Sequence, residues 1–351
     1  MRKRRPSLYA AHAAALCIAC TVATTQEPLP EATAQETALN AATVYRRAFA
    51  EMSRVLREES DDPVDYPWVD VPRAEAYAEA PWPKLLEETA VARSLFAQAG
   101  SIGRCRFDKP TGDGPLGDEV QERTSDLVTM RTFVLAHAFR VVEMQPGTAL
   151  ADLEALFSCA RHLEQQDSLF AQLVAMDMAR SALRICDAML AVREEHAAGA
   201  TILRRAIAAV EAHARKRSGP KRLAELSVAD ARQLLSLAYE EEVKDREAFR
   251  AAQTRAIALI EELVRPLREA TVGDGEKVDL AAKAAINALK KKFDPKQQMK
   301  LLESGSGEAL AALLATLVAP NASGLFRQWE EHGETLAKTA KALRARLRED
   351  R

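Results

Sequence analysis

The chain contains few of the residues from which common catalytic and metal sites are built. It has 5 cysteines and 6 histidines among 351 residues. Beyond residue 23 it has no Cys-x-x-Cys motif, and it has no His-x-x-x-His spacing, which would place two zinc ligands on one helix face. It also lacks the Gly-x-Ser-x-Gly turn of acyl-transfer enzymes and the Gly-Lys-Ser/Thr end of a phosphate loop. The sequence therefore predicts neither a cofactor nor a resident metal.

The chain also lacks an excess of positive charge. It carries 49 Lys and Arg residues against 51 Asp and Glu residues. Four of the basic residues and none of the acidic residues lie within 1–23, so the rest of the chain has a net charge of −6. Because nucleic-acid binding requires a basic surface, we predict no nucleic-acid partner.

Residues 1–23 have the order of features that is typical of a secretory signal peptide. A positive cluster at 2–5 precedes an apolar run at 8–23, which ends in small residues before a cleavage site after Ala23. No second apolar run of about 18 residues follows it. We therefore predict an exported protein of the periplasm or cell envelope. The alternatives are an uncleaved anchor, a buried first helix, or a lipid on Cys20, which follows Ala19 as in a bacterial lipoprotein signal. We expect membrane contact only through such a lipid or an uncleaved signal.

The remaining chain favours helices almost throughout. Polar, proline-containing residues 24–38 predict a disordered tether. Residues 39–117 are expected to contain N-terminal helices, at 40–58 and 84–100, and a glycine-rich loop. Residues 118–351 are expected to form a helical domain, either separate from 39–117 or continuous with it. The predicted fold is all-α, with antiparallel helix pairs in a tetratricopeptide-like arrangement or an irregular α-solenoid.

Between the first two predicted helices lies a segment rich in proline and aromatic residues, 61–83. Its five prolines exclude a long helix, so we expect it to cross the helices as an extended strap. Trp68 and Trp82 lie on this strap. They are interpreted either as packing anchors or as a platform for a ligand, and the two interpretations differ in whether the rings are buried.

The most regular pattern, 127–163, predicts a helical hairpin. Two apolar faces are separated by a Pro-Gly turn at 146–147, and alanines allow the two helices to approach closely. This hairpin, together with Cys105-Arg106-Phe107, Ala151-Asp152-Leu153 and Ala160-Arg161-His162-Leu163, resembles a family of exported bacterial helical proteins without assigned function. The opening Asn40-Ala41-Ala42 with Tyr45 is similar as well. The resemblance covers about residues 38–200 and implies export and a tetratricopeptide-like fold, but no catalytic residue.

One pattern suggests a different kind of protein. We expect a long helix at 228–269, in which Glu242 and Asp245 continue the apolar stripe and Glu241 lies beside them. Because burying bare carboxylates is costly, these residues must be paired, solvated or bound to a cation. Pairing with an arginine is one interpretation. An acidic cleft that binds a cation or a basic peptide is another, and two carboxylates three residues apart could also act as an acid and base pair.

Two further expectations concern single side chains. His162 is expected to cap a helix end or to lie at the surface, and Asp177 is expected to pair with Arg180 three residues later.

Taken together, these patterns favour an exported, non-catalytic binding or scaffold protein of the bacterial cell envelope, which holds a protein or peptide in a groove between helices. For this function, Trp68 and Trp82 are candidate binding residues. The alternative is a hydrolase or metal-dependent enzyme that uses Glu241, Glu242 and Asp245.

Overall fold

The computed structural model describes residues 40–58, 82–107, 123–192, 199–237, 246–294, 301, 307–318 and 321–349. Within these ranges every regular element is a helix and no strand is present, which confirms the all-α prediction. The predicted signal peptide, the tether and residues 61–81 of the strap lie outside them. So do Cys20, Ala23 and Trp68.

The first half of the chain packs around a hydrophobic core that we call the N-terminal core. It is formed by α3 (Ala41–Glu58), α4 (Trp82–Glu88), α5 (Ala90–Gly100), α7 (Thr124–Val141), α8 (Pro146–Glu164), α9 (Leu169–Ala191) and α10 (Ala200–Lys216). The helix α3 begins as expected, because the side chain of Asn40 accepts a hydrogen bond from the N–H of Ala42 at 3.2 Å. Its apolar stripe, with Tyr45 and Phe49 at its centre, is buried.

The predicted hairpin at 127–163 is present as α7 and α8, which pack against each other across the turn 142–145. The turn predicted at 146–147 is wrong, because Pro146 and Gly147 lie in the first turn of α8, where the missing N–H of proline costs no hydrogen bond. The helix expected at 84–100 is divided at Thr89, whose hydroxyl donates to the carbonyl of Leu85 at 2.7 Å. It also begins earlier than expected, at Trp82. The end of the predicted strap is therefore helical, because Pro83 lies in the first turn of α4, where the missing N–H costs no hydrogen bond.

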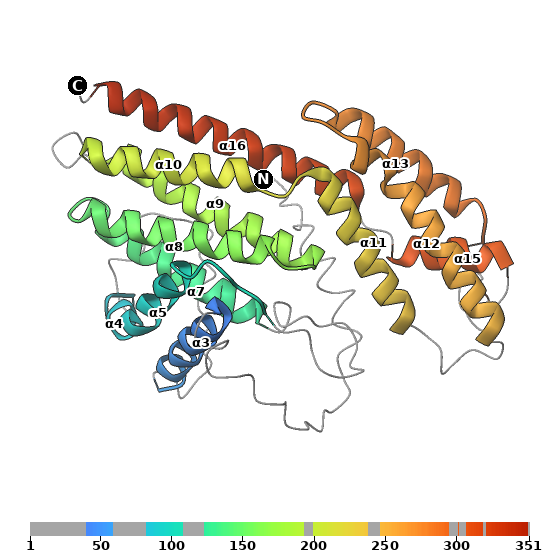
Figure 1. Ribbon diagram of the computed structural model, residues 1–351, viewed down its shortest axis with the longest axis horizontal. Coiled ribbons are helices and arrows are strands. Elements are labelled where there is room, and N and C mark those ends of the chain that lie inside the picture. Colours follow the sequence, from blue (N-terminus) through green and yellow to red (C-terminus); the bar gives the residue numbers. More distant parts are fainter. Residues whose placement is uncertain are drawn as a thin grey trace, which may run out of the picture.

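The second half of the chain builds a separate hydrophobic core, the C-terminal core, at one end of the molecule (Figure 1). It is formed by α11 (Pro220–Leu237), α12 (Arg246–Glu269), α13 (Gly275–Lys290), α15 (Gly307–Val318) and the first half of α16 (Ala322–Glu349). The second half of α16 packs instead on α9 and α10 of the N-terminal core. Because the last helix returns to the middle of the chain, the helices do not form a simple linear stack. The solenoid arrangement stays a prediction.

The long helix expected at 228–269 is wrong, because α11 and α12 are two helices that pack against each other. Arg232 Nη2 lies 2.5 Å from Glu261 Oε1, although a continuous helix would separate these residues by about 43 Å. The buried side chain of Gln253 also donates to the carbonyl of Leu235. The apolar stripe is interrupted at 238–245 because the two stripes belong to different helices. The argument for buried carboxylates at Glu242 and Asp245 therefore loses its premise.

One stretch, Gly307–Glu349, contains an 18-residue window that is apolar enough to cross a membrane by length and composition alone. Of this window, 56% is buried inside the fold, as in the core helix of a folded protein. The expectation that no second apolar run of about 18 residues follows residue 23 is therefore wrong by composition, although the described parts of this stretch form two helices, α15 and α16.

Candidate functional site

Most of the residues proposed from sequence as a site lie outside the described part of the chain. Glu241, Glu242 and Asp245 fall between α11 and α12, and Trp68 falls between α3 and α4. Trp82 is described, and it is only 5% exposed. Its ring packs edge-on against Phe133 of α7, with 5.9 Å between ring centroids. Trp82 is therefore a packing residue of the N-terminal core and offers no surface to a ligand.

His162 is also buried, contrary to the expectation of a surface or capping residue. Its Nε2 lies 2.8 Å from the carbonyl of Ile102 and its Nδ1 lies 3.0 Å from the hydroxyl of Tyr45. A carbonyl only accepts, so Nε2–H donates to it and Nδ1 accepts from Tyr45. Burial lowers the pKa of His162 and so favours the neutral ring. The hydrogen bond to Ile102 has the opposite, smaller effect on this pKa. This network fastens the segment 101–107 to α3 and α8.

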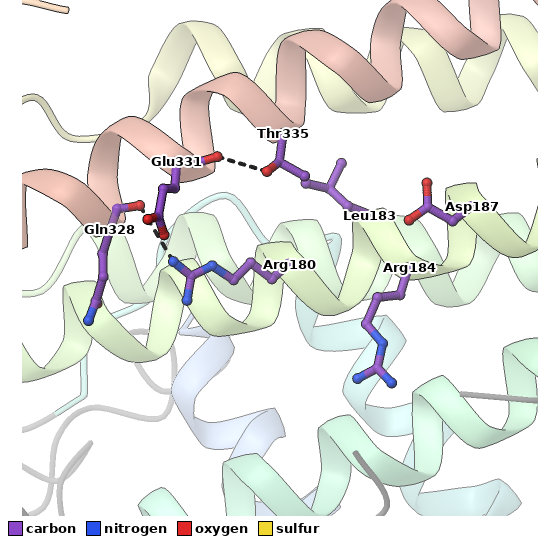
Figure 2. A pocket seen from close by; sticks show the side chains of 7 residues that line it. All are labelled: Arg180, Leu183, Arg184, Asp187, Gln328, Glu331 and Thr335. Carbon is purple, nitrogen blue, oxygen red and sulfur yellow. Dashed lines mark hydrogen bonds between the residues drawn. The ribbon is translucent and has the colours of Figure 1, made fainter. Parts of the chain in front are cut away.

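A surface groove between α9 and α16 is the best candidate for a binding site (Figure 2). Its volume is about 470 Å³. The side chains that line it come from successive turns of the two helices: Arg180, Leu183, Arg184 and Asp187 of α9, and Gln328, Glu331 and Thr335 of α16. Leu183, which is 2% exposed, forms an apolar floor, and the rims carry two guanidinium groups, two carboxylates, an amide and a hydroxyl.

The groove has unused hydrogen-bonding capacity at Arg180. Arg180 does not pair with Asp177 as expected, because Asp177 pairs with Arg131 of α7. Among the described residues, Arg180 instead makes one long hydrogen bond, at 3.5 Å to the carbonyl of Gln328, although a guanidinium has five N–H donors. The side-chain oxygen of Gln328 is buried beside the groove and finds no donor in the described part of the chain. The open group is therefore the guanidinium of Arg180.

The charge of the groove is mixed. Partial burial raises the pKa of Asp187, and the nearby Lys338 opposes this effect. Glu331 and Thr335 are exposed on the opposite rim, where the Thr335 hydroxyl donates to the carbonyl of Glu331 at 2.7 Å. The seven lining residues include no histidine, cysteine or serine, and the groups on the rims are suited to recognising a ligand by charge and hydrogen bonds.

A second groove, of about 550 Å³, lies between α3 and the start of α7. Arg46, Arg57 and Arg123 line it together with Asp126, and Arg123 Nη1 lies 3.3 Å from the carboxylate of Asp126. Both helices lead into ranges outside the described residues, 59–81 and 108–122. We therefore take the α9–α16 groove, whose walls are described throughout, as the candidate site.

Other potentially reactive side chains are packed between the helices. Cys105, Cys159 and Cys186 are buried thiols, and burial raises the pKa values of Cys159 and Cys186, which disfavours the nucleophilic thiolate. His137 Nδ1 lies 2.6 Å from Asp152 Oδ2 between α7 and α8. No group of three histidine, cysteine, aspartate or glutamate residues in the described ranges could hold a metal ion.

Comparison of the chain with models of protein families, with curated proteins and with solved structures finds no match. The resemblance to exported bacterial helical proteins therefore stays a prediction.

Proposed function

We propose that this protein is a non-catalytic binding protein of the cell envelope, which holds a peptide segment in the α9–α16 groove. The observation that carries the proposal is the unused donor capacity of Arg180. Its guanidinium faces the groove, and among the described residues it makes a single hydrogen bond of 3.5 Å, although it has five N–H donors.

A peptide that carries a carboxylate matches this group. Its carboxylate would accept charge-assisted hydrogen bonds from Arg180. The exposed carboxylates of Asp187 and Glu331 would disfavour a peptide with several negative charges, so the preferred ligand carries one carboxylate, or a carboxylate next to a basic residue.

A random peptide library displayed on phage tests this proposal. Selection against the immobilised chain is expected to enrich peptides with an acidic residue. For a selected peptide, Arg180→Ala should weaken binding by about 10-fold or more in fluorescence polarisation, because a hydrogen bond to a charged group is lost. The matched control is Arg204→Ala, which removes an exposed arginine of α10 away from the groove. Equal binding by the two variants, or no enriched peptide, would refute the assignment.

Export is tested by the native mass of the protein purified from the envelope fraction of its own cells. Cleavage after Ala23 predicts a bare chain that begins at Thr24. A lipid-sized increment on a chain that begins at Cys20 would instead show an anchored protein, and a full-length chain in the cytosolic fraction would contradict export. A bound divalent ion, lost on Glu242→Gln and Asp245→Asn substitution, would support the enzyme alternative in place of the binding function.

A further inference from the structure

A pair of buried histidines joins α10 to α16. His213 of α10 and His332 of α16 are each 1% exposed, and their Nε2 atoms lie 3.3 Å apart. The two rings meet edge to face, with 5.5 Å between centroids, and the His213 ring also packs on Phe157 of α8. The helices α10 and α16 run side by side at this point (Figure 1).

The hydrogen bonding of the pair is incomplete. Only one proton can lie between two nitrogen atoms, so one ring donates through Nε2 and the other accepts there. The accepting ring must then carry its own proton on Nδ1. Both Nδ1 atoms are buried and have no partner among the described residues. Two neutral rings therefore hold together by a single hydrogen bond. If both rings were protonated, two N–H groups would face each other, and the contact would be lost.

The groups around the pair are mostly positive. Arg161 of α8, Arg180 of α9 and Arg217, which follows α10, all act on the histidines. The acid beside them is Glu164 at the end of α8, whose Oε1 lies 4.0 Å from His213 Nε2 and which accepts a hydrogen bond from the N–H of Ser218. Burial, followed by the charges of Arg161 and Arg217, lowers the pKa of His213 to about 4. Burial and then His213 lower the pKa of His332 to about 3. Burial raises the pKa of Glu164 to about 8.

The pair lies where the two cores meet. On α16, the side chains of Ala322, Phe326 and Trp329 belong to the C-terminal core, and those of Leu336, Ala340 and Leu343 belong to the N-terminal core. His332 lies between these two sets. Around it the halves are joined by polar contacts. Arg217 stacks on the Trp329 ring at 4.2 Å and donates to the Trp329 carbonyl at 2.7 Å, while the indole N–H donates to Ser218 at 2.8 Å.

We propose that the His213–His332 pair is an acid-sensitive latch between the two cores. When both rings take up protons, two cations would be buried at hydrogen-bond distance among three arginines. The favourable response is separation of α16 from α10, which hydrates the rings. Because α16 carries part of the C-terminal core, its release weakens the contact of that core with the N-terminal core, which is then held by the packing of α11 on α9. The latch acts whether or not the groove holds a peptide.

The pH dependence follows from the direction of each pKa change. A histidine whose pKa is lower in the folded chain stabilises the fold at pH values above its pKa in the unfolded chain, about 6.5. This stability is lost as the pH falls toward the pKa of the histidine in the folded chain. A glutamic acid with a raised pKa acts in the opposite direction, so its contribution is lost as the pH rises from about 4.5 toward about 8. The junction is therefore most stable near pH 6.5.

The number of protons exchanged on unfolding gives the slope of the folding constant against pH. Between pH 6.5 and 4.5 the two histidines gain two protons on unfolding and Glu164 loses one, so these three groups together lower the folding constant about 10-fold for each unit of acidification. In Glu164→Gln the opposing proton is absent, and their contribution steepens to about 100-fold per unit. In His213→Gln or His332→Gln the contribution of the junction is expected to disappear, so the acid slope becomes shallower than that of the wild-type chain.

The decisive experiment is hydrogen exchange of the full chain between pH 7 and pH 4, resolved by peptide and corrected for the intrinsic rate. We expect peptides of α10 and α16 around the pair to lose protection at a higher pH than peptides of α3, α5 and α7. His332→Gln should move this loss to lower pH. Simultaneous loss of protection throughout, in the wild-type chain and the variant alike, would overturn the latch.

A second measurement does not depend on a variant that folds. Nuclear magnetic resonance of the histidine rings in the wild-type chain follows each protonation directly. The rings of His213 and His332 are expected to stay neutral at pH 5 and to take up protons as α16 loses protection. If both of these rings titrate near 6.5 with the fold intact, the proposal is wrong.

Discussion

Replacing Tyr45 with alanine is expected to lower the free energy of unfolding by about 3–5 kcal/mol, because it removes a fully buried aromatic ring from the N-terminal core. This ring packs against Phe49, Phe96 and Phe107, with 6.3, 5.2 and 6.1 Å between the ring centroids. Its hydroxyl also reaches His162. One side chain thus joins α3, α5, α8 and the segment 101–107. Urea denaturation followed by circular dichroism measures the change.

The conservative variant Tyr45→Phe separates the ring from the hydroxyl. It keeps the aromatic contacts but leaves His162 Nδ1 without its donor, so we expect a loss of about 1–3 kcal/mol. If Tyr45→Phe is as unstable as Tyr45→Ala, the hydrogen bond rather than the ring holds this part of the core together. If both variants equal the wild-type chain, the placement of α3 on α5 and α8 is wrong.

Replacing His332 with lysine is expected to cost about 3–5 kcal/mol at neutral pH, because it buries a permanent charge without an adequate partner. Arg180 and Arg217 lie near the position, and the acid at the junction is Glu164, whose pKa burial raises to about 8. At neutral pH the lysine carries the positive charge that the His332 ring would acquire by protonation at low pH. Loss of protection in α16 should therefore occur without acidification.

The matched control is His332→Met, which has a side chain of similar length without the charge. The difference in unfolding free energy between the lysine and methionine variants isolates the effect of the charge from that of the lost imidazole. Equal stability of the two variants would mean that water reaches position 332, and the junction would then be open in the folded chain.

The peptide-binding groove and the His213–His332 latch both include residues of α16. Gln328 and Glu331 line the groove, and His332 follows directly. Arg180 also has both roles, because it lines the groove and lies near enough to His332 to lower its pKa. If the groove binds a peptide and the latch opens in acid, peptide affinity should fall with the protection of α16. Each of these premises has its own experiment above.

The sequence alone determined that the described part of the chain is helical and which faces of α3, α7 and α8 are buried. These features follow from apolar periodicity, from a cap at Asn40 and from the proline that begins α8, and all of these act within a few residues of the chain. Such signals also explain the error at 228–269. Two apolar stripes separated by a short interval have the same local pattern whether the chain continues straight or reverses.

Only the tertiary structure decided which helices meet. His213 and His332 are 119 residues apart, and Tyr45 and His162 are 117 apart, so no local pattern relates them. His162 looked like a capping residue because it lies in the last turn of its helix, yet the segment 101–107 covers it. The candidate groove also depends on contact between helices that are far apart in the chain. Arg180 and Gln328 have surface periodicity on their own helices, and they form a site only because α16 returns to pack on α9.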